Sequence, residues 1–205
     1  PEGKIEAKHT HNNNEQSPIV LILHPDPSRG GTMNTKIVFK LYKLFVKNGF
    51  SAIRFNFRGV GKSQGVYDDG EGELSDAASV LDWLQQYNTN SKICWVAGFS
   101  FGAWVAMQLL MRRPEINGFV NISPPANLRD FSFLAPCPSS GLIVHGDKDH
   151  IASFDSSKIL AEKLQKQKKV DIKFKPIKGA DHFYENYSKE FTNIVDSYIK
   201  DSLKS

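Results

Sequence analysis

A serine between two glycines is the first group in this sequence whose setting suggests chemistry. Ser100 is the centre of Gly98-Phe99-Ser100-Phe101-Gly102, which joins an apolar run of strand length to an apolar run of helical length. A nucleophile on a sharp strand-to-helix turn needs small neighbours, because larger side chains would clash within the turn. The pattern therefore predicts a nucleophilic Ser100 at the end of a central strand. The alternative is that Ser100 only caps the helix that follows.

A serine nucleophile requires a base, and the base requires an acid that orients it. His182 follows a strand pattern at residues 170–177, and Asp147 and Asp149 follow another at residues 141–146. Parallel strands present such groups at their carboxyl ends, so we expect these loops to converge on Ser100. The sequence predicts a triad of Ser100, Asp149 and His182.

Two other aspartates lie close to the predicted acid. Asp147 directly follows a turn glycine, where an aspartate commonly binds the backbone of its own turn. Asp149 lies two residues further on and has more reach toward the next loop, so we favour it over Asp147. Asp181 is adjacent to His182, and adjacent side chains tend to point apart. We interpret Asp181 as a turn residue.

Acyl transfer also needs backbone amides that bind the developing oxyanion. The amide of Phe101, at the start of the helix, faces the same space as Ser100. A second amide is expected in the loop HPDPSRGG at residues 24–31, which follows another strand pattern. Proline has no amide hydrogen, so Asp26 is the nearest donor, provided that its acidic side chain points to solvent. The alternative is that this loop is merely rigid.

Neither a nucleotide cofactor nor a metal is expected. The stretch GVGKS at residues 59–63 matches the end of a phosphate-binding loop, but Asn56 stands where the first glycine of that motif belongs. No helical pattern begins before about residue 73, so we interpret the stretch as a surface loop whose glycines permit positive φ angles. His9 and His11 belong to a polar N-terminal tail, and no cluster of histidines has the spacing of metal ligands.

Strand and helical patterns alternate along the chain. The strand patterns cover residues 18–24, 50–57, 92–99, 116–123, 141–146 and 170–177, and the helical patterns cover residues 35–49, 72–87, 101–113, a basic stretch around 159–164, and 190–203. This alternation is typical of an α/β fold with a mostly parallel central sheet and helices on both faces. We expect a single domain over residues 1–205 without a large cap domain. The long irregular segment 123–141 offers a place for a small lid.

The composition favours a soluble cytoplasmic protein over an exported, membrane-bound or nucleic-acid-binding one. No apolar run approaches the roughly 20 residues of a membrane-spanning helix, the N-terminus has no apolar signal core, and two cysteines cannot form a disulfide framework. The net charge of +4 owes much to the lysines between residues 158 and 178. We interpret these lysines as a solvated face, because Ile159, Leu160 and Leu164 recur between them at helical spacing.

Several motifs resemble those of the α/β-hydrolases, and more closely a compact, lidless bacterial group near the dienelactone-hydrolase-like members. They are LILHPDPSRGGTMN, FNFRGVGKSQG, GELSDA, WVAGFSFGAW, PPANLRDFSFLAPCPSSGLIVHG and GADHF, and the resemblance runs from about Gly3 to the C-terminus. It implies an α/β-hydrolase fold with Ser100 as nucleophile, Asp149 as acid and His182 as base, and without a cofactor. The group commonly has a proline at the position of Ser153.

The favoured hypothesis is a serine hydrolase that cleaves a small carboxylic ester or thioester through an acyl-enzyme. A peptidase or amidase with the same residues is the first alternative, and a non-catalytic binding protein that retains the fold is the second. We expect a small acyl substrate as the partner, with Tyr67, Phe131, Phe133 and Leu134 as walls of an apolar pocket. The same aromatic residues also suit the core or the surface of a homodimer.

Overall fold

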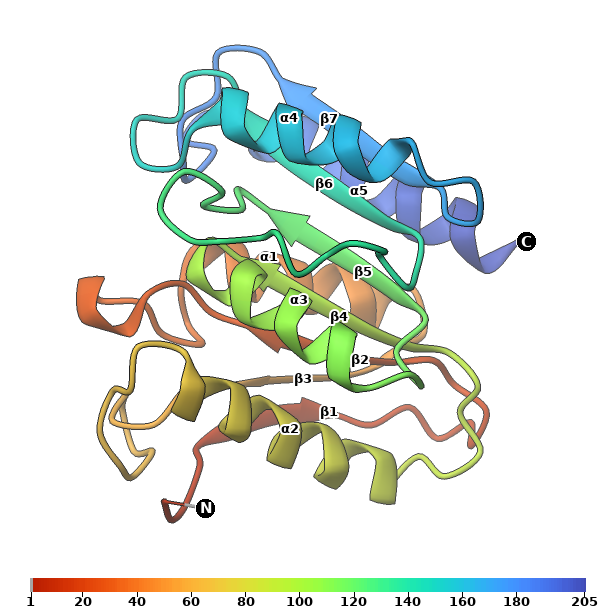
Figure 1. Ribbon diagram of the computed structural model, residues 1–205. Coiled ribbons are helices and arrows are strands. Elements are labelled where there is room, and N and C mark those ends of the chain that lie inside the picture. Colours follow the sequence, from red (N-terminus) through yellow and green to blue (C-terminus); the bar gives the residue numbers. More distant parts are fainter. Residues whose placement is uncertain (1) are drawn as a thin grey trace.

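The computed structural model describes residues 2–205 and contains a seven-stranded sheet in the order β1-β3-β2-β4-β5-β6-β7 (Figure 1). β1 is antiparallel to β3, and the other neighbouring strands are parallel. The strands are β1 (Ala7–Thr10), β2 (Ile19–Leu23), β3 (Ser51–Phe55), β4 (Cys94–Phe99), β5 (Gly118–Ile122), β6 (Gly141–Gly146) and β7 (Ile172–Ile177). The helices are η1 (Pro27–Arg29, a short 3-10 helix), α1 (Lys36–Lys47), α2 (Glu71–Gln86), α3 (Phe101–Arg112), α4 (Phe154–Gln165) and α5 (Ser188–Leu203). The carboxyl ends of β2 to β7 therefore form one edge of the sheet.

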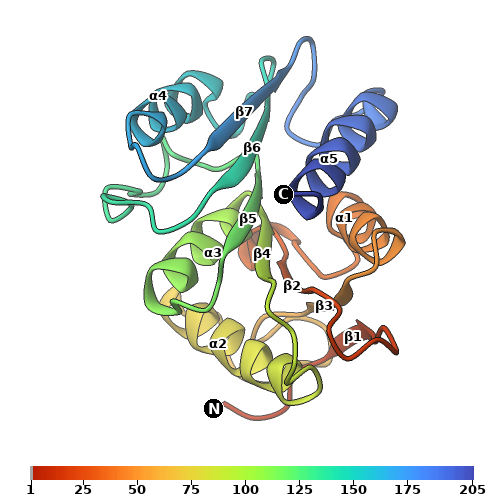
Figure 2. The same cartoon turned by 90° about the vertical axis from the view of Figure 1, so that its right-hand side faces the viewer.

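Two helical layers cover the sheet, with α1 and α5 on one face and α2, α3 and α4 on the other (Figure 2). Successive residues of a strand point to opposite faces, so β2 contributes Leu21 and Leu23 to one hydrophobic cluster and Val20 and Ile22 to the other. A sheet buried on both faces explains why its strands read as continuous apolar runs. The predicted α/β fold is confirmed, and residues 2–205 contain no cap domain.

The edge strand β1 was not expected from the sequence, which suggests a polar tail around His9. The structure instead pairs His9 with Ile53 of β3, and the His9 ring packs edge-on against Trp83 with the ring centroids 5.1 Å apart. The four residues of β1 are exposed or half-buried and carry no apolar alternation. Their strand conformation follows from hydrogen bonding to the edge of β3 and not from their own side chains.

The glycine-rich loop at residues 59–63 is bound to the N-terminal segment. Ser63 Oγ accepts a hydrogen bond from the Glu6 amide at 2.9 Å and donates one to the Asn56 carbonyl at 2.7 Å. The Lys62 amide donates to the Glu6 carboxylate at 2.8 Å. Gly61 has a φ of 53°, and a Cβ there would lie 2.6 Å from the Glu6 carboxylate. α2 begins well after this loop, so the surface-loop interpretation accounts for its sequence.

The basic segment forms α4 and β7. α4 buries Leu160 and Leu164 against the sheet, whereas the lysines between residues 158 and 178 are all exposed. Ser153, where the family resemblance suggested a proline, is the N-cap of α4, and its hydroxyl accepts a hydrogen bond from the Ser156 amide at 3.1 Å. A serine cap therefore starts this helix without a proline.

Candidate active site

Ser100 occupies the turn between β4 and α3 in a strained backbone conformation. Its φ is 55° and its ψ is −119°, which is rare for a residue with a side chain and costs about 1–3 kcal/mol. The backbone holds the turn, because the Ser100 amide donates to the Ile122 carbonyl at 2.9 Å and the Ser100 carbonyl accepts from the Ala103 amide at 2.8 Å. The Ser100 hydroxyl does not cap α3, so the helix-cap alternative is wrong.

The glycines on either side of Ser100 permit two close backbone approaches. A Cβ on Gly98 would lie 2.4 Å from the Gly102 carbonyl oxygen, and a Cβ on Gly102 would lie 2.3 Å from the Leu23 carbonyl oxygen. Contacts this short with backbone atoms cannot be relieved by moving a side chain. Gly98 therefore permits the turn itself, and Gly102 lets the first turn of α3 approach the end of β2.

The structure brings Asp149 and His182 together. His182 Nδ1 lies 2.6 Å from Asp149 Oδ2, and both side chains are almost completely buried. A carboxylate oxygen only accepts, so Nδ1 carries the proton and Nε2 keeps its lone pair. The His182 ring lies 5.1 Å, between centroids, from the ring of Phe99, the residue before Ser100. Among residues 2–205 no hydrogen bond joins Ser100 to His182, and in unliganded enzymes such bonds are often long and tighten with substrate.

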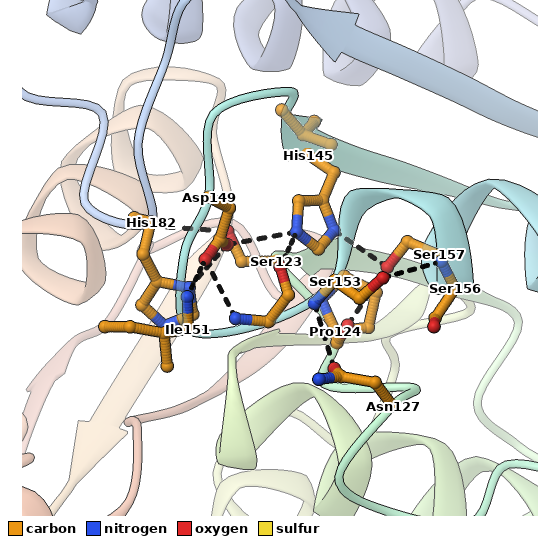
Figure 3. Close-up of polar contacts among 12 residues, drawn as sticks. Ser123, Pro124, Asn127, His145, Asp149, Ile151, Ser153, Ser156, Ser157 and His182 are labelled. Carbon is orange, nitrogen blue, oxygen red and sulfur yellow. Dashed lines mark hydrogen bonds and ion pairs between the residues drawn. The ribbon is translucent and has the colours of Figure 1, made fainter.

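Asp149 receives hydrogen bonds on both carboxylate oxygens (Figure 3). Oδ1 accepts from the amides of Ile151 and Ala152, each at 2.8 Å, and Oδ2 accepts from His182 and from His145 Nε2 at 3.0 Å. Burial alone would raise the pKa of Asp149, but the hydrogen bonds from His145 and His182 lower it well below its ordinary value. The carboxylate is therefore ionised at neutral pH, as an orienting acid requires.

The competing aspartates bind backbone amides. Asp147 Oδ1 accepts a hydrogen bond from the Gly179 amide at 2.6 Å, which ties the loop after β6 to the loop after β7. Asp181 Oδ1 accepts from the Glu185 amide at 2.9 Å. Among residues 2–205, His182 has a hydrogen bond to neither of these carboxylates. Asp181 therefore binds within its own turn, as expected, whereas Asp147 binds the loop after β7 and not the backbone of its own turn, so that expectation was wrong for Asp147. Asp149 is left facing the histidine.

Tyr184 attaches the loop that carries His182 to β6 and to the end of β5. The hydroxyl of Tyr184 donates to the Val144 carbonyl of β6 at 3.1 Å and lies 2.7 Å from Ser123 Oγ at the end of β5. Tyr184 is buried, and burial raises the pKa of its phenol far above the ordinary value, so it stays a neutral donor. Nothing in the sequence distinguished Tyr184 from an ordinary aromatic residue.

The two predicted oxyanion donors, Phe101 and Asp26, flank the contact between α3 and β2. Neither amide donates a hydrogen bond within residues 2–205. The Asp26 carboxylate accepts from the amide of Ser28 at 2.8 Å and from its hydroxyl at 2.7 Å. Its charge is therefore held by the N-terminus of η1, which accounts for an acidic residue in this loop.

His24 supports this loop and was not singled out from the sequence. The residue is fully buried, its Nδ1 donates to the Pro25 carbonyl at 2.7 Å, and its Nε2 accepts from the Phe57 amide at 3.0 Å. Burial is the main reason why the pKa of His24 falls to about 4. A neutral ring satisfies both contacts and ties the loop after β2 to the end of β3. A histidine directly after an apolar strand was the only available signal.

The predicted pocket residues divide into two groups. Phe131 and Leu134 are buried in the hydrophobic cluster of the α2–α4 face, and Phe133 stacks on Phe131 from a half-buried position. The burial of Phe131 and Leu134 favours the core alternative that the sequence left open. Tyr67 lies against Phe101 with the ring centroids 6.1 Å apart, and its hydroxyl donates to Asp69 at 3.0 Å. Tyr67 is the member of the set that remains beside the predicted oxyanion site.

Metal clusters and membrane-spanning helices are both absent from residues 2–205. No group of three or more histidines, cysteines, aspartates or glutamates in this part of the chain is placed to hold a metal ion. None of the described helices combines the length and apolar character needed to cross a membrane.

Comparisons with known proteins agree with the α/β fold described above. Residues 3–198 match the family model described as X-Pro dipeptidyl-peptidase (S15 family). A protein of unknown function from Agrobacterium tumefaciens, proposed to be an α/β hydrolase, is 51% identical, with 100% of this chain and 94% of that chain covered and a TM-score of 0.97. An α/β serine hydrolase homologue from Coxiella burnetii is 35% identical, with coverages of 97% and 93% and a TM-score of 0.87. A lysophosphatidylserine lipase of Xenopus tropicalis is 26% identical over 227 residues, which span 89% of this chain and 57% of the lipase.

Proposed function

Because the chain belongs to the α/β hydrolases, within the X-Pro dipeptidyl-peptidase (S15) family, we propose that it cleaves small carboxylic esters or thioesters through a catalytic triad. The nucleophile is Ser100, the base is His182 and the orienting acid is Asp149. The observation that carries the proposal is the 2.6 Å hydrogen bond between Asp149 and His182, beside a serine held on a strained turn. A strained residue at a loop-lined edge of the sheet is typical of a functional site.

The proposed reaction proceeds through an acyl-enzyme. His182 Nε2 takes the proton of Ser100 as Oγ attacks the substrate carbonyl, and the amides of Phe101 and Asp26 bind the oxyanion that forms. His182 then gives the proton to the leaving alcohol or thiol, and the acyl group stays on Ser100. A water molecule, deprotonated by His182, releases the acid and restores the serine. Asp149 stays ionised throughout and stabilises the imidazolium.

Serine chemistry is further supported by the state of the two cysteines. Cys94 and Cys137 are buried and free, and burial raises the pKa of Cys94 to about 12 and also raises the pKa of Cys137. Thiols of this kind are poor nucleophiles. We also propose a small acyl compound as the substrate and the cytoplasm as the location, where free buried thiols of this kind are common.

A peptidase is the second candidate, and the match to the X-Pro dipeptidyl-peptidase family favours it. The same triad cleaves amides when the pocket binds the peptide and His182 protonates a leaving amine. The likeness to a lysophosphatidylserine lipase favours the ester instead. Turnover of p-nitrophenyl esters of increasing acyl length, compared with X-Pro p-nitroanilides, separates the two candidates.

A fluorophosphonate probe tests the nucleophile directly, because it reacts with activated serines whatever their substrate. We expect the wild-type protein to be labelled and Ser100→Ala to lose all labelling. Ser51→Ala is the matched control, since Ser51 is also a buried serine on a parallel strand but lies at the amino end of β3, where its hydroxyl accepts a hydrogen bond from the Asn12 amide. Labelling that survives in Ser100→Ala would refute the assignment. No labelling and no turnover of any ester, thioester or amide would favour a binding protein.

A further inference from the structure

A second histidine contacts the proposed catalytic acid from the opposite side to His182. His145 lies near the end of β6 and is fully buried. Its Nε2 is 3.0 Å from Asp149 Oδ2 and 3.0 Å from the Ala152 carbonyl oxygen. Both partners only accept hydrogen bonds, so His145 Nε2 carries a proton and donates it. In Figure 3 the Asp149 carboxylate lies between the two imidazole rings.

The other nitrogen of His145 is also engaged. Nδ1 lies 2.7 Å from Ser157 Oγ, at the buried face of α4, and Ser157 Oγ lies 3.0 Å from the Pro124 carbonyl oxygen. These contacts tie three segments to the ring: the end of β6, the loop after β5 and the first turns of α4. The ring of His145 has no freedom to turn, because both nitrogens are held in the interior.

We propose that His145 is a positioning residue for the reaction and acts through Asp149. This inference rests on the proposed function of Ser100, Asp149 and His182. The amides of Ile151 and Ala152 hold Oδ1, and His145 holds Oδ2 from the side of the sheet. Together they fix the plane of the carboxylate, so that the remaining lone pair of Oδ2 is directed at His182 Nδ1. Without His145, that oxygen has a single partner.

His145 also withdraws negative charge from the oxygen that His182 uses. Loss of this hydrogen bond would leave more negative charge on the oxygen that faces the imidazole. The other titratable groups near this carboxylate are His182 itself and Tyr184, two residues further along the loop of His182. Both of them remain unchanged when His145 is replaced. A change in the titration of His182 would therefore report the loss of the His145 contact.

Two amide substitutions form a matched pair for the test. In His145→Gln the side-chain NH₂ reaches the position of Nε2 and donates to Asp149, whereas in His145→Asn the amide is one methylene shorter and reaches only the position of Nδ1. Both variants place the same polar group in the same buried site. An effect that depends on hydrogen bonding to Asp149 distinguishes them, and a merely structural effect does not.

The readout is the titration of the His182 ring, followed by NMR in the full-length protein. We expect the titration midpoint of His182 in His145→Asn to lie about half a pH unit to one pH unit above the wild-type midpoint. This shift corresponds to part of the free energy of a charged hydrogen bond. In His145→Gln we expect the wild-type midpoint. Equal midpoints in the two variants, or a lower midpoint in His145→Asn, would overturn the inference. This holds whether or not the variants lose thermal stability.

The rate of fluorophosphonate labelling as a function of pH gives a second readout. We expect the acid limb of the His145→Asn profile to move upward with the NMR midpoint, and that of His145→Gln to stay in place. A wild-type protein that is never labelled would refute the proposed function, and the NMR titration would still decide whether His145 acts on Asp149. If all three proteins are labelled with identical pH profiles, the proposed role of His145 is refuted, whereas the proposed function of Ser100 is not.

Discussion

Acidification is expected to destabilise the protein through His24, the buried histidine that ties the loop after β2 to the end of β3. Its ring is neutral because one nitrogen donates to the Pro25 carbonyl and the other accepts from the Phe57 amide. A proton added to the second nitrogen would remove that acceptor and place a charge in a fully buried site. Protonation of the folded state is therefore strongly disfavoured, whereas the unfolded chain binds the proton readily.

The size and sign of the effect follow from the two pKa values. Burial lowers the pKa of His24 from 6.5 in the unfolded chain to about 4 in the folded protein. Between these values the unfolded state binds more protons, so stability is fully present above pH 6.5 and is lost as the pH falls toward 4. The full shift corresponds to about 3 kcal/mol, most of which is lost by pH 4.5.

Urea unfolding between pH 7.5 and 4.5, followed by tryptophan fluorescence, measures this loss. His24→Gln is the comparison, because its side-chain oxygen accepts from the Phe57 amide and does not titrate. We expect the advantage of the wild type over this variant to shrink by about 2–3 kcal/mol across the range. Other groups with lowered pKa values, such as Asp149, are common to both proteins and cancel. A difference that stays constant with pH would refute the reasoning.

Two further substitutions test the scaffold of the site. Gly102→Ala places a Cβ 2.3 Å from the Leu23 carbonyl oxygen, so we expect a loss of about 1–3 kcal/mol in urea unfolding together with loss of fluorophosphonate labelling, and wild-type values in both assays would contradict the close-approach argument. Asp76→Asn removes the buried charged partner of the Arg58 guanidinium, 2.9 Å away, and leaves the exposed Glu2 carboxylate at 3.9 Å, so we expect a loss of about 3–5 kcal/mol in the same assay. The control is Asp82→Asn, in an exposed ion pair, with an expected loss of at most about 0.5 kcal/mol. Similar losses at both aspartates would show that burial is not the cause.

The sequence was informative where a residue type has only one physical reason to be present. Gly98 and Gly102 predicted a close backbone approach around Ser100, and the structure shows short approaches at both positions. Apolar runs of strand length predicted strands buried on both faces, which is how β2 to β6 are packed. The alternation of strands and helices then placed Asp149 and His182 at the same edge of the sheet.

The sequence was silent where a role depends on contacts between distant segments. His145 looks like an ordinary strand residue, and its contact with Asp149 exists because the loop after β6 turns back toward the strand. β1 could not be predicted from its own residues, because its strand conformation depends on pairing with β3. Phe131 and Leu134 suit a pocket as well as a core, since apolar residues in an irregular segment carry no periodicity that separates the two.

At the Ser100 turn the backbone sets the local shape, and the side chain is the proposed reacting group. Its shape is set by main-chain hydrogen bonds to Ile122 and Ala103 and by the absence of side chains at the flanking glycines. The hydroxyl contributes nothing to that shape, because it does not cap the helix. Another small reactive side chain, such as a thiol, can therefore replace the hydroxyl at position 100 while the backbone of the turn keeps its shape.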